Sequence, residues 1–404
     1  MSTPAHYMNY SPRARRRAWL LDRSAGPPLG ALARLLAGVR MRPDGGRPAF
    51  LLIRCDHLGD LLMATPAVRA LRRAHPAARI DMMVSPGAAA ALVGNPDVDG
   101  ILEFEAPWYE PHSGRELQPW KACAAAASIL GRGYDAVVEM RGDPRMIALA
   151  ALSGARTRAG FRRLGLEAVL TDSVPFDPRR SHLERNFDVL ARLGVRGPEA
   201  PEDFRPFLSV CQTARSAAAR LLTPYAVIAP ATGRPRHNWG AANFAVVADG
   251  LRALGLDVFI VGRSSEVAVT HAVASAMRRS ATDLTGRTDL VTLGAILERA
   301  AILVANDSGS VHVAAAVGCP VVAVFGPTSP ALSFPYIGSL ARRAGILAVA
   351  LAGPTACERP CFREGCEDDH GYGAIMPATV LEACREVLDE ASAGRLAGRP
   401  ESPA

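Results

Sequence analysis

The stretch that decides the fold is VANDSGSVHVAAAVGCPVVAVFGPTSP, residues 304–330. An apolar strand over 301–305 breaks at Asn306, a polar turn follows, and a small-residue helix over 313–317 leads to a second strand that ends at Phe325. Strands joined through a helix are typical of an α/β sheet, which places its ligands outside the carboxyl ends of its strands. The turn leaves backbone N–H groups available to an anion. It is therefore either a phosphate-binding turn or an ordinary βα turn in which Asp307 or Ser308 caps the helix.

A similar segment lies near the start of the chain, where the apolar run 49–54 is followed by CDHLGD. Apolar residues then recur at helical spacing over 61–74, so a second strand, turn and helix is predicted. The turn lacks the Gly-x-Gly-x-x-Gly spacing of a dinucleotide site and the Gly-Lys-Ser/Thr ending of a P-loop, which argues against a dehydrogenase or an NTPase. Its Asp60 lies at a helix start, where a carboxylate is a helix cap or, facing a cleft, a general base.

Length and composition fit two globular domains. The chain has 404 residues, of which 49% are hydrophobic and 21% charged, and these values are ordinary for such proteins. No apolar run approaches the roughly 20 residues needed to cross a bilayer. Strand and helix signals alternate on both sides of a Pro-rich break at 198–206, which indicates mostly parallel sheets. We expect a basic N-terminal arm, two α/β domains, and a C-terminal helix with a tail, with bounds 1–47, 48–205, 206–376 and 377–404.

The N-terminal arm carries much of the net charge of +7. Its arginines alternate with Trp19 and several leucines, and a basic segment with apolar stripes suits an anionic membrane surface. Gly26, Pro27, Pro28 and Gly30 interrupt the segment, so a loosely ordered arm is the favoured interpretation. The charged region, apolar region and small-residue cleavage site of a secretory signal peptide do not follow one another in this segment. Nucleic-acid binding is poorly supported.

Cysteine usage indicates a reducing cytoplasm, because four of the eight cysteines are scattered singly. Cys357, Cys361 and Cys366 instead cluster with His370, which raises the hypothesis of a zinc site. Their spacings of three and four intervening residues differ from the paired two-residue spacing of strong zinc motifs. A loop with free or partly paired thiols is favoured, and no metal ligand is assigned.

A further pair of basic residues, Arg141 and Arg145, directly follows a predicted buried strand over 136–140. They lie at a carboxyl end, on the side where a parallel sheet binds ligands. Arginines in this place suit an anionic acceptor, and surface ion pairs are the alternative.

Taken in order, these loops resemble glycosyltransferase family nine, the lipopolysaccharide heptosyltransferases, over residues 50–388. The matching motifs are LGD at 58–60 with ATPA at 64–67, NPDVD at 95–99, RGDPR at 141–145, GAR at 154–156, His182 and Asn186, Thr285 and Gly286, NDSG at 306–309 with His312, and FGPT at 325–328 with Pro330. Agreement in order over several loops is far more specific than any one motif.

The resemblance implies an α/β protein of the GT-B class, with two Rossmann-like domains and mostly parallel sheets facing a central cleft. It implies an inverting, metal-independent transfer of a heptose from an ADP-activated donor, with no cofactor besides that nucleotide-sugar substrate. Asp60 matches the proposed base of the family. The implied donor-binding residues, in the second domain, are Thr232, Gly233, Arg236, His237, Glu266, Asp307, Ser308, Gly309 and His312. The implied acceptor-binding residues, in the first domain, are Arg54, His57, Arg141 and Arg145.

One departure from the family pattern concerns the donor phosphates. The family usually has a lysine two residues before the position of Trp239, where this chain has His237. Histidine is only partly charged near neutrality, so either Arg236 or Arg234 supplies the missing cation, or the donor or the activity differs. A second small hydroxyl residue of the family is also replaced, by Gly233.

The sequence thus predicts a cytoplasmic heptosyltransferase with a glycolipid core or another glycan as acceptor and no nucleic-acid partner. Contact with the inner membrane surface stays open. The alternatives are a transferase with a different nucleotide-sugar donor or a natural-product acceptor, and a catalytically silent protein that binds nucleotide sugars. An epimerase on a related fold is disfavoured, because neither a Tyr-x-x-x-Lys pair nor a dinucleotide turn is found.

Overall fold

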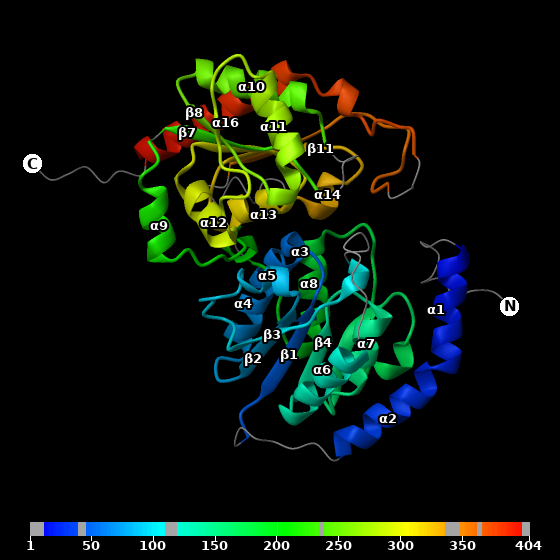
Figure 1. Cartoon of the computed structure of the whole chain (residues 1–404). Coiled ribbons are helices and arrows are strands. Elements are labelled where there is room, and N and C mark those ends of the chain that lie inside the picture. The colour runs from blue at the N-terminus through cyan, green and yellow to red at the C-terminus, as the bar shows by residue number, and fades with distance from the viewer. Residues whose placement is uncertain are drawn as a thin grey trace, which may run out of the picture. The chain divides into compact units, whose positions relative to one another are not determined.

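The computed structural model describes most of the chain (Figure 1). The described residues are 12–38, 46–109, 119–199, 201–222, 224–233, 238–335, 347–361 and 366–397. The chain divides into two compact units, Met1–Glu199 and Ala200–Ala404, which we call unit 1 and unit 2. Among the described residues, no helix combines the length and the apolar character that crossing a membrane requires.

Unit 1 is built on a six-stranded parallel sheet with the order β3-β2-β1-β4-β5-β6. Its central strand β1 is buried along its whole length, as expected of an apolar run covered on both faces. The strands are β1 Ala49–Arg54, β2 Arg79–Val84, β3 Gly100–Glu103, β4 Ala136–Glu139, β5 Thr157–Arg162 and β6 Asp172–Pro175. The helices are α1 Pro12–Ser24, α2 Gly26–Gly38, α3 Leu58–Leu62, α4 Thr65–Ala74, α5 Pro86–Ala89, η2 Pro107–Tyr109, α6 Pro119–Gly131, α7 Pro144–Ala151, η4 Glu167–Val169, α8 His182–Leu190 and η5 Ala191–Leu193.

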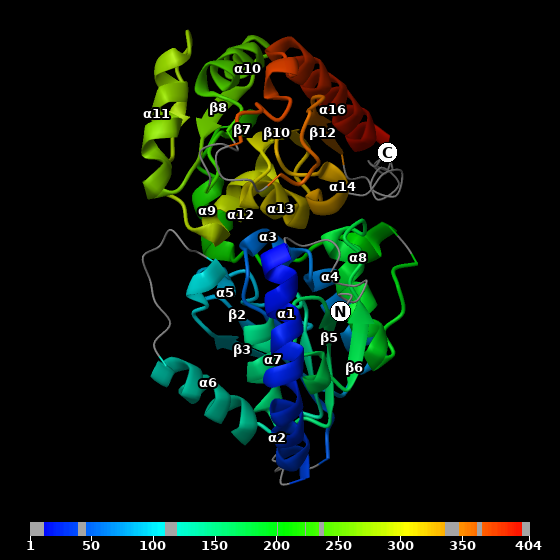
Figure 2. The ribbon, with the colours of Figure 1, turned by 90° about the vertical axis from the view of Figure 1, so that its right-hand side faces the viewer.

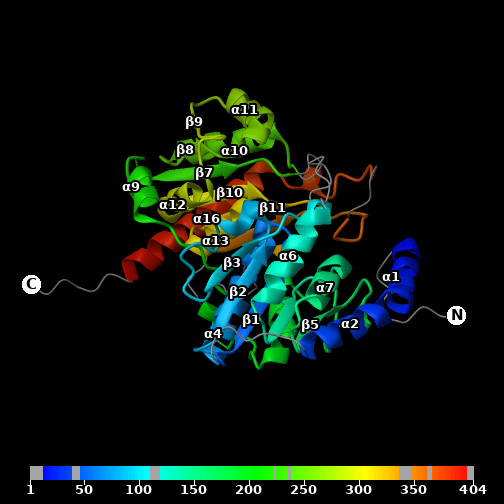
Figure 3. The ribbon, with the colours of Figure 1, turned by 60° about the horizontal axis from the view of Figure 1, so that its bottom comes forward.

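Successive side chains of β1 point to opposite faces of the unit 1 sheet, and their contacts show which helices cover each face. Leu51 shares a hydrophobic core with Ile129 of α6 and Leu149 of α7, so these helices cover one face (Figure 3). Phe50 points the opposite way, and its ring meets that of His75 at the end of α4 with 5.0 Å between centroids. Helix α4 therefore lies on the other face, where it contacts α8.

Unit 2 repeats the same arrangement, with the strand order β12-β11-β10-β7-β8-β9 and parallel pairing throughout. Counted from the first strand of each unit, both sheets have the order 3-2-1-4-5-6 of the Rossmann fold. The strands are β7 Tyr225–Ala229, β8 Asp257–Ile260, β9 Thr282–Asp283, β10 Ile302–Asn306, β11 Val321–Phe325 and β12 Ala348–Ala352. The helices are η6 Pro201–Phe204, α9 Gln212–Ala218, α10 Ala241–Ala253, η8 Ser264–Glu266, α11 Val267–Ala276, α12 Leu290–Arg299, α13 Gly309–Val317, α14 Pro330–Ser333, η9 Tyr372–Ala374 and α16 Pro377–Ala397. Helix α16 contacts α10, β11 and β12 of its own unit (Figure 2).

The N-terminal segment differs from the expected loosely ordered arm, because it forms the helices α1 and α2. Pro27 and Pro28 fall in the first turn of α2, where a missing N–H costs nothing. Gly30 allows close contact with unit 1, since a Cβ there would lie 2.6 Å from the carbonyl oxygen of Ala168. Ala33 is fully buried in a small core with residues of α7 and η4. The interrupting residues are thus what lets the segment pack.

Two predicted helices have different bounds in the structure. The single helix expected over 61–74 is divided into α3 and α4, because Pro66 begins a new first turn. The helix after the turn of β10 begins at Gly309, earlier than the small-residue run suggested. Both differences bring polar turn residues closer to a helix N-terminus.

Candidate functional site

Five ionisable side chains meet at the carboxyl end of β1 and form what we call the β1 charge cluster. Arg54 lies at its centre, with Nε 2.9 Å from Asp56 Oδ1 and Nη2 3.1 Å from Asp60 Oδ1. Arg141 Nη1 lies 3.0 Å from Asp56 Oδ2. His182 Nδ1 lies 2.6 Å from Asp60 Oδ1. The cluster therefore joins residues of the β1 turn to residues that follow β4 and begin α8.

Two neighbouring contacts hold this cluster in place. Arg54 Nη1 donates to the carbonyl oxygen of Met140 at 2.7 Å, so the buried guanidinium is also bonded to the backbone beyond β4. Helix α8, which carries His182, begins with a capping box in which Ser181 and Glu184 each accept from the other's backbone N–H. A capping box fixes the first turn of a helix, and with it the direction of the first side chains.

Burial and ion pairing act in opposite directions on the two aspartates of the cluster. Burial by itself would raise the pKa of Asp60, but His182 and Arg54 hold this pKa well below its usual range. For Asp56, burial outweighs the pairing with Arg54 and raises the pKa. Asp60 is therefore the carboxylate whose ionised form the cluster stabilises.

The side chain of Asp60 forms ion pairs and does not act as a helix cap. His57 is the N-cap residue of α3, and the Asp60 side chain bonds instead to His182 and Arg54. Both contacts fall on Oδ1, so within the described residues Oδ2 is the oxygen left for a ligand.

The other expected acceptor residues of unit 1 lie beside this cluster or outside it. Arg145 is paired with Asp143, the cap of its own helix, at 2.7 Å, and its guanidinium lies 4.3 Å from the ring centre of Trp108. Arg141 stacks similarly on Tyr109 at 4.4 Å. His57 is exposed, and its side chain makes no cap bond. Of the four, only Arg54 and Arg141 belong to the cluster.

A buried carboxylate that the sequence analysis missed supports the turn after β4. Glu139 accepts from the backbone N–H groups of Arg141 and Asp143, each at 3.2 Å, and also from that of Gly142. Burial and the nearby charge of Asp143 raise the pKa of Glu139 to about 8. The sequence signal for this support was an acid, Glu139, inside an apolar strand. An acid is almost never fully buried without polar partners, so its presence there indicates such partners.

In unit 2, the turn after β10 is organised by the buried side chain of Asn306. Its amide oxygen accepts from the backbone N–H of Trp239 at 3.0 Å, and its amide nitrogen donates to the carbonyl oxygen of Pro230. Thr232 N donates to Asn238 Oδ1 at 3.0 Å. The turn after β10 and the loop after β7 are thus held together at one edge of the sheet, where ligands bind in such folds.

Ser308 occupies the N-cap position of α13 without acting as a cap. Its backbone is extended and its side chain makes no cap bond. Its Oγ is buried and has no hydrogen-bond partner among the described residues. The hydroxyl and the first N–H groups of α13, which begins at Gly309, therefore form a set of donors at the positive end of a helix dipole.

The remaining residues expected to bind the donor lie near the turn after β10, near Arg263, or outside the described residues. Asp307 Oδ2 accepts from Ser333 Oγ at 3.4 Å, and His312 is buried within α13. Glu266 is already paired with Arg263, whose Nε and Nη2 lie 2.9 and 2.8 Å from its Oε1. Gly233 lies beside the same guanidinium, since a Cβ there would be 3.4 Å from Nη2. Arg236 and His237 lie outside the described residues.

Solved structures of glycosyltransferases align with this chain over both units. The glycosyl transferase family 9 protein of Veillonella parvula DSM 2008 aligns with a TM-score of 0.73 at 24% identity, over 87% of this chain and 99% of that one. The E. coli heptosyltransferase WaaC with ADP aligns with a TM-score of 0.65 at 19% identity, over 84% and 99%. A further structure of that enzyme contains ADP-2-deoxy-2-fluoro heptose. The two Rossmann-like units thus have the fold of GT-B glycosyltransferases, which confirms the predicted fold class.

The sequence comparison defines the family. The profile described as glycosyltransferase family 9 (heptosyltransferase) matches residues 123–366, more than half of the chain. The lipopolysaccharide heptosyltransferase 3 of Escherichia coli strain K12 is 25% identical in an alignment of 287 positions that covers 67% of this chain and 80% of that protein. The chain belongs to glycosyltransferase family 9 and is a glycosyltransferase enzyme, as the sequence motifs predicted.

Proposed function

We propose that this protein transfers a heptose from an ADP-activated donor to a lipopolysaccharide core or a related glycan, with inversion at the anomeric carbon. The similarity to a lipopolysaccharide heptosyltransferase of Escherichia coli supports the acceptor. The ADP and ADP-heptose analogue in WaaC support the donor. The observation that carries the proposal is the ionised Asp60, held by His182 and Arg54 at the carboxyl end of β1.

The proposed chemistry is a single displacement with Asp60 as general base. The acceptor hydroxyl gives its proton to Asp60 Oδ2 while its oxygen attacks the anomeric carbon of the donor. The bond from that carbon to the phosphate oxygen breaks, and its electron pair leaves with ADP. Arg54 and His182 act as positioning residues, because both contact Oδ1 and so aim Oδ2. Arg141 is the cation offered to an anionic acceptor.

The proposed donor site uses the turn after β10. The Ser308 hydroxyl and the first N–H groups of α13 are suited to the negative charge that develops on the leaving ADP. Asn306 positions this turn against the loop after β7 through Trp239 and Pro230. In the family a lysine neutralises the donor phosphate. That Arg236 or His237 supplies this positive charge here stays a prediction.

The proposed location is the cytoplasm, with a peripheral contact at the inner membrane surface. The exposed arginines Arg16 and Arg17 of α1 support such a contact, together with the exposed apolar side chains of Leu20 and Leu35. Basic and apolar residues on one helical segment favour an anionic bilayer. No nucleic-acid partner is proposed.

Calorimetric titration with ADP, UDP and NAD⁺, each without and then with magnesium, tests the donor. We expect a preference for ADP that does not depend on magnesium. A preference for UDP would keep the fold and replace the donor, and NAD⁺ binding would contradict the chemistry. Incubation with ADP-heptose and a heptose-deficient core glycolipid then tests transfer, and the anomeric configuration of the product tests inversion. ADP binding without turnover would favour the silent binding protein.

A further inference from the structure

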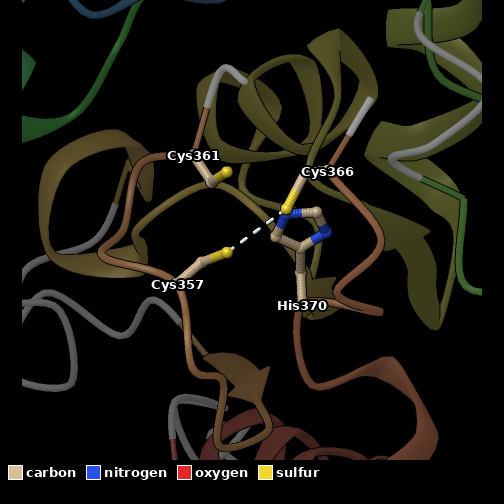
Figure 4. Close-up of side chains that lie close together, drawn as sticks. All are labelled: Cys357, Cys361, Cys366 and His370. Carbon is tan, nitrogen blue, oxygen red and sulfur yellow. Dashed lines mark hydrogen bonds between the residues drawn. The ribbon is translucent and has the colours of Figure 1, made fainter. Parts of the chain in front are cut away.

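Four metal-binding side chains converge in the loop between β12 and α16 of unit 2. The donor atoms of Cys357, Cys361, Cys366 and His370 all lie within 4.8 Å of one another. Figure 4 shows the three thiols and the imidazole ring pointing toward one another from different parts of the loop. The Sγ atoms of Cys357 and Cys366 are 3.3 Å apart. We call these four residues the thiol-histidine cluster.

The cluster is partly buried, with Cys357 and Cys366 half-exposed, and it contains an unsatisfied polar atom. His370 and Cys361 are only 3% and 8% exposed. The Nε2 atom of His370 is buried and has no hydrogen-bond partner among the described residues. Because buried polar atoms in proteins are nearly always bonded, this nitrogen indicates a missing ligand. The backbone of His370 has a φ of +56°, a conformation that non-glycine residues seldom adopt without a local reason.

Side chains behind the cluster orient its members. Asp368 accepts from the backbone N–H of His370 and from the Thr355 hydroxyl, the latter at 2.8 Å. Thr355 Oγ1 in turn accepts from the backbone N–H of Cys357 at 3.1 Å. Arg359 donates to the carbonyl oxygen of His370 at 2.7 Å. Such outer contacts around potential ligands are typical of metal sites in proteins.

We propose that the thiol-histidine cluster binds one thiolate-preferring divalent metal ion, Zn²⁺ or Fe²⁺, in tetrahedral coordination. Three cysteines and one histidine are an established ligand set for structural zinc, with Zn–S distances of about 2.3 Å. Tetrahedral geometry at that length separates the sulfur atoms by roughly 3.8 Å, so small side-chain movements suffice. Each thiol that binds releases its proton to solvent, and the ion undergoes no redox change. All four positions are filled, which makes the site structural.

The metal would fix the loop beside the turn after β10. The backbone N–H of Cys361 donates to the carbonyl oxygen of Pro327 at 2.8 Å, just after β11. Tyr372, two residues after His370, packs so closely on Gly326 that a Cβ there would lie 2.3 Å from the ring. The backbone N–H of Asp307 donates to the carbonyl oxygen of Val324 at 3.1 Å, so this end of β11 adjoins the turn after β10. A structural ion would thus support the donor turn, and this coupling alone rests on the proposed function.

Metal analysis of the full-length protein tests the site without any substrate. The protein is purified under reducing conditions without chelators, and zinc and iron are measured by inductively coupled plasma mass spectrometry. We expect about one equivalent of zinc or iron in total, and the measurement distinguishes the two. The variants Cys357→Ser and His370→Gln should lose most of it. Cys211→Ser and His271→Gln, which change exposed residues of unit 2 outside the cluster, should retain it.

Reconstitution with Co²⁺ tests the metal site in the wild-type protein, so the result does not depend on how well the variants fold. Wild-type protein stripped of metal should take up one Co²⁺ with the visible absorption of a tetrahedral thiolate complex, and Zn²⁺ should displace it. A purified protein with no metal and no cobalt spectrum would overturn the proposal, as would a Cys357–Cys366 disulfide under these conditions. Metal content unchanged in both cluster variants would also overturn it. ADP titration of the same samples reports on the proposed function separately.

Discussion

Unit 1 and unit 2 have the same strand order, yet the ends of their strands present different chemistry. In unit 1, the carboxyl end of β1 carries side-chain charges, with Arg54 between Asp56 and Asp60 and with His182 beyond. In unit 2, the turn after β10 offers a neutral hydroxyl and backbone N–H groups at the start of α13. The same sheet edge is thus equipped with titratable groups in one unit and mainly with fixed dipoles in the other.

This difference suits the two tasks of a glycosyltransferase. Removing a proton from an acceptor hydroxyl requires a group that can change its charge, which a carboxylate can do and a backbone amide cannot. Binding a diphosphate requires donors that stay in place while charge develops, and helix N-termini provide these without reorganisation. The comparison therefore predicts that substitutions in unit 1 change turnover, while substitutions in unit 2 change donor binding.

The largest effect is expected from Asp60→Asn. Turnover should fall by about two to four orders of magnitude, the usual contribution of a general base, while ADP affinity stays nearly unchanged. Heptose transfer and calorimetry on the same preparation separate the two quantities. Asp177→Asn is a matched control, because that aspartate pairs with Arg179 at the surface of the same unit. Wild-type turnover in the Asp60 variant would rule out its assignment as the base.

An intermediate effect is expected from Ser308→Ala in unit 2. Losing one hydrogen bond to a charged phosphate should weaken ADP binding by roughly tenfold and leave turnover at saturating donor nearly intact. Titration calorimetry measures the first quantity and steady-state kinetics the second. Ser275→Ala on the exposed face of α11 is the control. A loss confined to turnover would break the proposed division between the units.

The smallest effect concerns the pH dependence of unit 1 through Glu139. A pKa of about 8 in the folded state, against the ordinary 4.5, means that the folded state binds this proton more tightly. The stabilisation is complete below about pH 4.5 and is lost as the pH rises through about 8. Glu139→Gln should flatten this decline, as measured by hydrogen exchange of the β4 amides corrected for intrinsic rates. An equal slope in both proteins would show that Glu139 is not the titrating group.

Sequence reasoning was strongest where a motif is continuous in the chain. The runs around Asp60 and Ser308 each contain strand, turn and helix within a few residues, so their local structure could be predicted. The pairing of His182 with Asp60 joins residues 122 positions apart, and no local pattern encodes it. The same holds for Asp56 and Arg141, which are brought together by the pairing of β1 with β4.

The N-terminal segment and the cysteine loop show the limits of composition and spacing. Gly and Pro predicted a loose arm, but Gly30 is the residue that lets α2 approach Ala168. The spacing of Cys357, Cys361 and Cys366 matches no strong zinc motif, yet the loop folds so that His370 completes a set of four. Propensity scales report local preferences, which tertiary packing can override.

The sequence by itself determined the two α/β halves, the glycosyltransferase family and the turns that carry Asp60 and Ser308. These features depend on hydrophobic periodicity and short-range turn chemistry, which act within a few residues. Only the tertiary structure decided which charges meet, which carboxyl group has a lowered pKa and which thiols surround His370. Electrostatic pairing and metal coordination act over a few ångströms in space, and such distances between remote residues are set by packing.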